Sequence, residues 1–208
     1  MCTWRTHLMG PIALFLLFSG CGGGAGLTGP SAPGFVNVAF DKAGLSVLLE
    51  DTACVWVRFY NARRNAKDDP GSVMAVAVNG KGKEYAIAGT PVHYRLSDRI
   101  VGSNVSYLEW GREKAVDGCN WMRAAGKDVV ACDMSARVLR KMLSISTCNG
   151  ILVTPASTPD RALTMRFAAA TLSGGVAREL TGPGTSVICG EPCPVLCSDD
   201  VDYVHDEP

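Results

Sequence analysis

The stretch CVWVRFY, residues 54–60, has the two-residue alternation of a β-strand. Successive side chains of a strand point to opposite faces. One face would therefore carry the apolar side chains of Val55, Val57 and Phe59. The other face would carry a mixed set: Cys54, Trp56, Arg58 and Tyr60.

Six more short runs resemble strands and lie on both sides of this stretch: 35–40, 45–50, 73–78, 84–88, 92–96 and 105–110. The run at 73–78 ends in Asn79-Gly80, which is a strong hairpin signal. Runs that follow one another every 8–12 residues or so are typical of a β-sandwich or an antiparallel sheet. We expect such a sheet over residues 35–110.

The pattern changes after Trp110. Residues 111–128 show no clean period, whereas residues 132–146 have the period of an amphipathic helix. Asp133 would cap this helix, one stripe of it would be apolar, and three bases would face outward: Arg137, Arg140 and Lys141. The fold class predicted is α+β, mainly antiparallel and sandwich-like over 35–110, followed by a mixed part with one or two helices.

Residues 150–189 contain one ambiguous segment between two short strands, which are expected at 151–154 and 185–189. Within residues 158–175, alternate apolar side chains suit a strand. However, Thr158-Pro159 resembles a helix start, and Gly174 could end a helix. We therefore favour a helix for this segment.

The N-terminus has the features of a secretory signal. It carries Arg5 and no acid, and its apolar run Pro11–Phe18 is far shorter than a membrane-spanning helix. The stretch Leu17–Cys21 resembles the lipobox of bacterial lipoproteins, although Phe18 stands where that family usually has Leu. The alternative is a plain secreted protein, in which Cys21 would join the structural cysteines.

The resemblance to bacterial lipoproteins covers residues 1–21 and implies several properties. The chain would be cleaved before Cys21, and this cysteine would carry acyl chains such as palmitate. Three acyl chains make a stable anchor, because each buried CH₂ adds about 0.8 kcal/mol of membrane affinity. Gly22, rather than Asp, after the lipidated cysteine implies the periplasmic face of the outer membrane.

Four segments follow from these features. Residues 1–20 would be the signal peptide, and residues 21–34 the lipidated cysteine with a Gly/Pro-rich tether. Residues 35–188 would form a single β-rich globular domain. Residues 189–208 would be a Cys-rich, acidic C-terminal tail.

The charge balance argues against nucleic acid as a partner. The chain has 20 Lys and Arg against 20 Asp and Glu, so its formal net charge is zero. A balanced chain has no general attraction for polyanions. The partners expected are the membrane, through the lipid anchor, and another envelope protein.

Cysteine usage agrees with export. After Cys2 and Cys21 are set aside, the remaining cysteines would form a disulfide framework with one left over: Cys54, Cys119, Cys132, Cys148, Cys189, Cys193 and Cys197. The connectivity stays open, with Cys119–Cys132 the favoured pair and the leftover thiol expected among the last three. The spacing of the last three is not that of common zinc sites, and no metal or other cofactor is expected.

The sequence contains none of the common catalytic motifs that would indicate a reaction. No nucleophile elbow, zincin, dinucleotide or Walker pattern occurs in the sequence. His93 is expected to be an exposed strand histidine. Four aromatic side chains could build a recognition surface or close a small core: Trp56, Tyr60, Trp110 and Trp121.

Two functions remain, and the first is favoured. The chain would be a membrane-anchored, non-enzymatic binding or assembly module. The alternative is an exported hydrolase or thiol-redox enzyme with a dispersed active site. A pocket that gathers His93 with carboxylates or a free cysteine would favour the enzyme, and a flat aromatic patch would favour the binding module.

Overall fold

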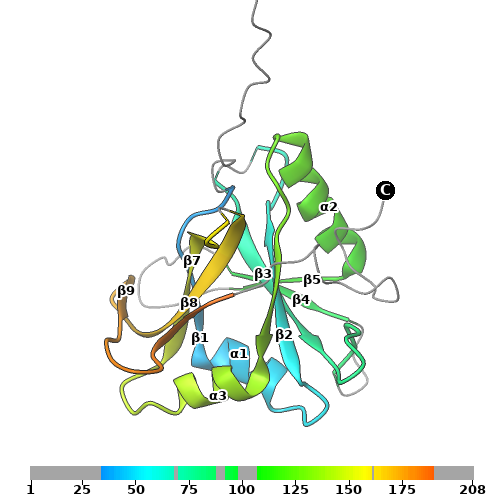
Figure 1. Ribbon diagram of the computed structural model, residues 1–208. Coiled ribbons are helices and arrows are strands. Elements are labelled where there is room, and N and C mark those ends of the chain that lie inside the picture. Colours follow the sequence, from blue (N-terminus) through cyan, green and yellow to red (C-terminus); the bar gives the residue numbers. More distant parts are fainter. Residues whose placement is uncertain (1–33, 68–69, 88–91, 98–106, 161, 190–208) are drawn as a thin grey trace, which may run out of the picture.

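The computed structural model describes residues 34–67, 70–87, 92–97, 107–160 and 162–189. These residues form two antiparallel sheets and three helices (Figure 1). The predicted class, α+β with two packed and mainly antiparallel sheets, is confirmed. The signal, the lipobox, the tether up to residue 33 and nearly all of the C-terminal tail lie outside the described residues.

The first sheet has the order β1-β7-β8-β10, with β9 paired to the far end of β8. Its strands are β1 (Val38–Asp41), β7 (Gly150–Ser157), β8 (Leu163–Ser173), β9 (Val176–Glu179) and β10 (Ser186–Ile188). Because β8 is the longest strand, it can pair with β7 along one edge and with β10 and then β9 along the other.

The second sheet has the order β5-β4-β3-β2-β6. Its strands are β2 (Trp56–Ala62), β3 (Ser72–Val78), β4 (Tyr94–Ser97), β5 (Tyr107–Trp110) and β6 (Ala131–Ser135). The opening stretch of the sequence forms β2 at the centre of this sheet, between β3 and β6. The predicted alternation is confirmed within β2, since Val57 and Phe59 belong to one core and Tyr60 to the other. It is wrong for the two residues before the strand, because Cys54 packs in the core of Phe59 and Val55 is exposed.

The main core lies between the two sheets. The ring of Phe59 from β2 packs against Phe40 of β1 and Phe167 of β8, at centroid distances of 5.4 and 4.8 Å. A second core lies on the opposite face of the β5-β4-β3-β2-β6 sheet and includes Tyr60 and Trp110. This sheet is therefore covered on both faces.

Helix α2 (Arg112–Ala124) covers the second core (Figure 1). The sequence shows no clear period here because the buried stripe consists of small or weakly apolar residues: Ala115, Gly118, Cys119 and Met122. Gly118 is the point of closest approach to the sheet. A Cβ there would lie 2.8 Å from the Trp110 ring and 3.1 Å from the Arg63 carbonyl oxygen.

The expected strand at 45–50 is wrong, because these residues belong to α1 (Lys42–Leu49). The Asp41 side chain accepts a hydrogen bond of 2.6 Å from the Gly44 N–H and caps the helix. Helical spacing buries Leu45, Leu48 and Leu49 together, whereas Val47 is exposed.

The expected helix at 132–146 starts later than predicted, since residues 131–135 are β6 and only α3 (Ala136–Leu143) is helical. Asp133 is a strand residue rather than the cap. The buried stripe is formed by Ala136, Leu139, Met142 and Leu143. The three bases predicted to face outward are exposed: Arg137, Arg140 and Lys141.

The helix favoured over residues 158–175 is also wrong, since β8 occupies most of that segment. Thr158 closes a turn instead of capping a helix. Its N–H donates to the Ala162 carbonyl, and its hydroxyl accepts from the Ala162 N–H. The alternation of Leu163, Met165 and Phe167 was the correct signal. The dense alanines suggested a helix, but they are buried in β8, which is paired with other strands on both edges.

Candidate functional site

A shallow groove of about 280 Å³ lies between α1 and α3, and we call it the helix-end groove. Two leucines, Leu49 and Leu143, supply its apolar part. The polar and charged residues that line it are Lys42, Ser46, Glu50, Arg140 and Ser144.

Two bases of the groove tie the helices together. Lys42 Nζ donates to the Leu143 carbonyl oxygen at 3.0 Å. The Arg140 guanidinium donates through Nε to the Leu49 carbonyl oxygen at 3.1 Å. Since both bases bond to uncharged carbonyls, their positive charge is left to act on the surface. Arg137 and Lys141 of α3 are exposed and add to that charge.

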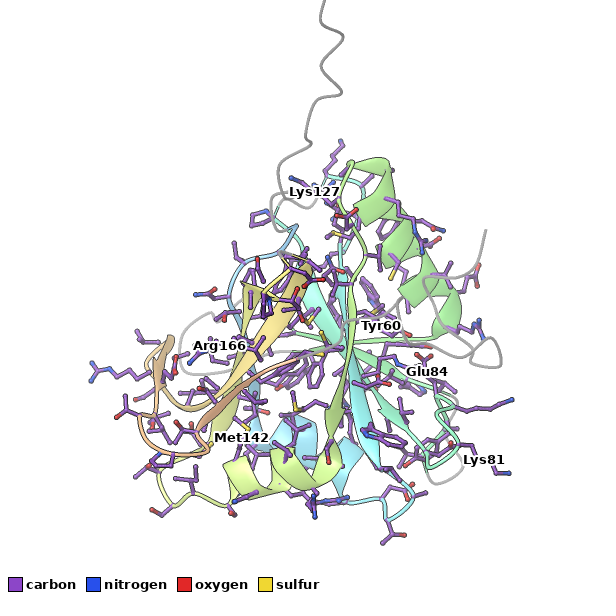
Figure 2. The ribbon with its side chains drawn as sticks, in the orientation of Figure 1. Tyr60, Lys81, Glu84, Lys127, Met142 and Arg166 are labelled. Carbon is purple, nitrogen blue, oxygen red and sulfur yellow. The ribbon has the colours of Figure 1, made fainter. Side chains whose placement is uncertain are left out.

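The helix-end groove lies far from the place where the described chain begins. Gly34 packs at the C-terminal end of α2, where a Cβ on it would lie 3.1 Å from Lys127 Cβ. Figure 2 shows Lys127 at one end of the molecule and Met142 of α3 toward the other. The groove therefore occupies the end opposite to Gly34.

A buried ionic network lies beneath α2, on the face of the sheet that carries Tyr60. The guanidinium of Arg58 donates to both carboxylate oxygens of Asp133, at 2.6 and 2.7 Å. Its Nη1 also lies 3.5 Å from Glu84 Oε1. Burial alone would lower the pKa of Arg58, but the bond to Asp133 raises it overall.

Glu84 also receives two tyrosine hydroxyls. Tyr60 donates to its Oε1 at 2.5 Å, and Tyr94 donates to its Oε2. Figure 2 shows Tyr60 and Glu84 side by side. Burial raises the pKa of Glu84, although the tyrosines and Arg58 favour the ionised form. Burial and the nearby carboxylate raise the pKa of both tyrosines.

The predicted turn after β3 places Glu84 in this network. The Asn79 N–H donates to the Lys83 carbonyl, and Gly82 takes the positive φ of 77° that the reversal needs. The chain then returns to pair Glu84 with Val78 in an isolated bridge, so the strand expected at 84–88 is wrong over the described residues 84–87. The side chains of Arg58 and Glu84 are 1% and 3% exposed. Because the network bonds to itself and only Asp133 of it is partly exposed, we interpret it as structural.

His93 does not join this network. Its side chain is 38% exposed, and its Nδ1 lies 4.0 Å from Glu109 Oε2. Glu109 is itself half exposed and is bonded to Arg95 at 2.6 Å. His93 is thus half-buried and directly precedes β4, so the expected exposed strand histidine is not observed; the carboxylate it meets is that of Glu109.

The four aromatic side chains do not form one flat patch. Tyr60 and Trp110 are buried in the second core, and Trp56 and Trp121 are half-buried. Lys114 Nζ lies 4.3 Å from the ring centroid of Trp121. A recognition surface built from these four residues is therefore not observed.

The five described cysteines are buried, and no disulfide joins any two of them in the structure. Cys119 belongs to the core beneath α2, whereas Cys132 belongs to the core between the sheets. The favoured pair, Cys119–Cys132, thus lies on opposite faces of one sheet and is not brought together. Cys21, Cys193 and Cys197 lie outside the described residues.

Burial is the main influence on the pKa of three of these thiols. It raises the pKa of Cys54 and Cys132, and it raises that of Cys119 to about 12. Thiol nucleophiles have lowered pKa values instead. Within the described part of the chain, no group of three or more His, Cys, Asp or Glu is placed to hold a metal ion.

Comparison with protein-family models, with curated proteins and with solved structures found no match to this chain. In the described ranges, no helix has the length and apolar character needed to cross a bilayer. The sequence indicated the exposed bases of α3, but the groove was missed because α1 was taken for a strand. The Asp41 cap three residues before Gly44 was the available signal.

Proposed function

We propose that the chain is an envelope lipoprotein, anchored through Cys21, that acts as a non-enzymatic binding or assembly module. The tether would join the domain at Gly34, and the helix-end groove would bind the partner. The observation that carries the proposal is that Gly34 and the groove lie at opposite ends of the domain. A domain tethered at one end presents its other end away from the membrane.

The chemistry of the groove indicates the kind of partner. The exposed bases around it outnumber its acids: Lys42, Arg137, Arg140 and Lys141 against Glu50 and the half-buried Asp51. Leu49 and Leu143 offer an apolar surface between them. We therefore infer a partner envelope protein that presents an acidic segment with an apolar side chain. Charge complementarity of this kind mainly sets the association rate and the choice of partner.

One cross-linking experiment in intact cells tests whether the groove is the binding surface and whether its positive charge attracts the partner. A photoreactive residue replaces the exposed Ser144 of the groove, and the matched control carries it at Val176, 52% exposed on β9. We expect a discrete adduct from position 144 alone. Reversing the charge of Arg137 and Lys141 to Glu should lower its yield severalfold. Equal adducts from both positions, or a yield that charge reversal leaves unchanged, would refute the groove as the binding surface.

The same cells test the anchor. The Cys21→Ala chain should move from the membrane fraction to the soluble fraction and should take up no labelled palmitate. A mutant that stays in the membranes after a salt wash, together with a wild-type chain that takes up no palmitate, would refute lipidation at Cys21.

A further inference from the structure

Two cysteines from different sheets meet at one threonine. Cys132 lies in β6 of the second sheet, and Cys189 follows β10 of the first; both are buried. The Thr164 hydroxyl lies 3.5 Å from Cys132 Sγ and donates to the Cys189 carbonyl oxygen at 3.0 Å. Thr164 therefore contacts both cysteines, through the Cys132 thiol on one side and the Cys189 backbone on the other.

Both backbones are held in place by strand pairing. The Cys189 N–H donates to the Met165 carbonyl oxygen of β8 at 2.9 Å. Cys132 pairs with Phe59 of β2, and β6 contacts β8 directly. The two cysteines are therefore held near one another by the strand pairing and by the packing of β6 on β8.

We propose that Cys132 and Cys189 form a disulfide that links the two sheets of the exported protein. The inference rests on the export that the proposed function includes. The two thiols lose two protons and two electrons as the S–S bond forms. The electrons pass to a disulfide oxidant by thiol–disulfide exchange, and that oxidant is reduced to two thiols.

The other described cysteines have different surroundings. The Cys54 thiol donates to the Trp56 carbonyl oxygen, and the Cys148 thiol donates to that of Gly150, each at 3.2 Å. Cys119 belongs to the buried stripe of α2, on the far face of the sheet from Cys132. The structure thus favours one inter-sheet bridge over the local pair 119–132.

The surroundings of the pair determine when the bridge forms. Burial and the neighbouring Cys189 thiol raise the pKa of Cys132, so little thiolate exists in the folded domain. Since the thiolate is the reactive form, we expect the bridge to form while the chain folds. Once formed, it would be shielded from reductants in solution by the same burial.

The test maps the disulfides of the full-length chain after refolding. The purified, reduced chain is refolded with glutathione disulfide, the remaining thiols are alkylated, and peptides are analysed by mass spectrometry. We expect a peptide linked through Cys132 and Cys189, and a thermal midpoint about 5–15 °C above that of the reduced chain. Cys189→Ser should remove the linked peptide, and the matched control Cys148→Ser should keep it.

A different partner for either cysteine, or alkylation of both after complete refolding, would overturn the proposal. The map of the wild-type chain gives this answer even if a serine variant fails to fold. A second map uses chain recovered from cell envelopes with its thiols blocked at lysis. A bridge found after refolding but absent from cells would refute export and leave the assigned pair intact.

Discussion

The two faces of the β5-β4-β3-β2-β6 sheet are both buried, but they bury different chemistry. On the face toward the first sheet, Phe59 packs against aromatic rings of β1 and β8. On the face beneath α2, the neighbouring residues of the same strand, Arg58 and Tyr60, enter an ionic network with Glu84. Strand β2 therefore contributes side chains to two cores, one held by apolar packing and the other by an ionic network.

The two faces differ in how strictly they fix the positions of their side chains, as well as in what they contribute to stability. Apolar burial is roughly proportional to area and tolerates side chains of similar volume. A buried guanidinium needs partners at defined positions, because an unpaired charge in a core is very costly. We therefore expect the face beneath α2 to fix the positions of β6 and the residue 79–84 turn more strictly than the apolar face fixes its neighbours.

The largest effect is expected when the ionic network is broken. Asp133→Ala removes both short bonds to the Arg58 guanidinium, which is 1% exposed. Removing one partner of a buried pair costs about 3–5 kcal/mol, and we expect about 3 kcal/mol because Asp133 is 31% exposed. Urea unfolding measures this loss. Asp133→Asn, which keeps the shape and one acceptor, is the matched control and should lose less.

A loss below about 1 kcal/mol for Asp133→Ala would place this pair with surface salt bridges. The contrast between the two faces would then not hold, because the polar face would tolerate the loss of a partner as a surface does.

A smaller effect is expected where α2 approaches the sheet. In Gly118→Ala, the new Cβ would meet the Trp110 ring at 2.8 Å and the Arg63 carbonyl oxygen at 3.1 Å. The ring can shift but the backbone carbonyl cannot readily do so, and overpacking typically costs about 1–3 kcal/mol. We expect a lower midpoint of thermal unfolding. Gly111→Ala, where a Cβ meets nothing within 4 Å, is the control from the N-terminal end of the same helix.

If Gly118→Ala had the same thermal midpoint as Gly111→Ala, the stability of the second core would not depend on the close packing of α2. The network beneath the helix would then tolerate a change in its cover, contrary to the strictness argued above.

The sequence predicted the class of fold better than its individual elements. The alternation in residues 56–60 was sufficient for β2, because the two-residue period does not depend on what covers each face. Residues 45–50 and 158–175 were misassigned because each carries two competing local signals, and the weaker-looking one was correct: the Asp41 cap before α1 and the apolar alternation in β8. No local pattern displays the pairing of both edges of β8.

The sites were harder to predict than the fold. Arg58 and Asp133 are 75 residues apart in sequence, and a charge in a strand is usually exposed, so nothing local pairs them. Cys132 and Cys189 are likewise joined only by the packing of β6 on β8. The exposed bases of α3 were predictable because the helical period alone places them outward.

The smallest effect concerns pH and separates the two faces most cleanly. Burial raises the pKa of Glu84 above its ordinary value of 4.5. The folded protein therefore holds this proton more tightly than the unfolded chain. As pH rises above about 4.5, the unfolded chain ionises first, so the free energy of unfolding falls until the pH passes the raised pKa. The contribution of Glu84 is thus complete below 4.5 and is lost at higher pH, with a slope of at most about 1.4 kcal/mol per pH unit.

Thermal unfolding of wild type and Glu84→Gln between pH 4 and 7 measures this contribution as a difference, in which the other carboxylates cancel. We expect the thermal midpoint of Glu84→Gln to rise relative to that of wild type as pH rises. Phe59→Leu, on the apolar face, is the control and should run parallel to wild type across the range. If Glu84→Gln also runs parallel, Glu84 has the same protonation in both states, and the ionic face differs from the apolar face in geometry alone.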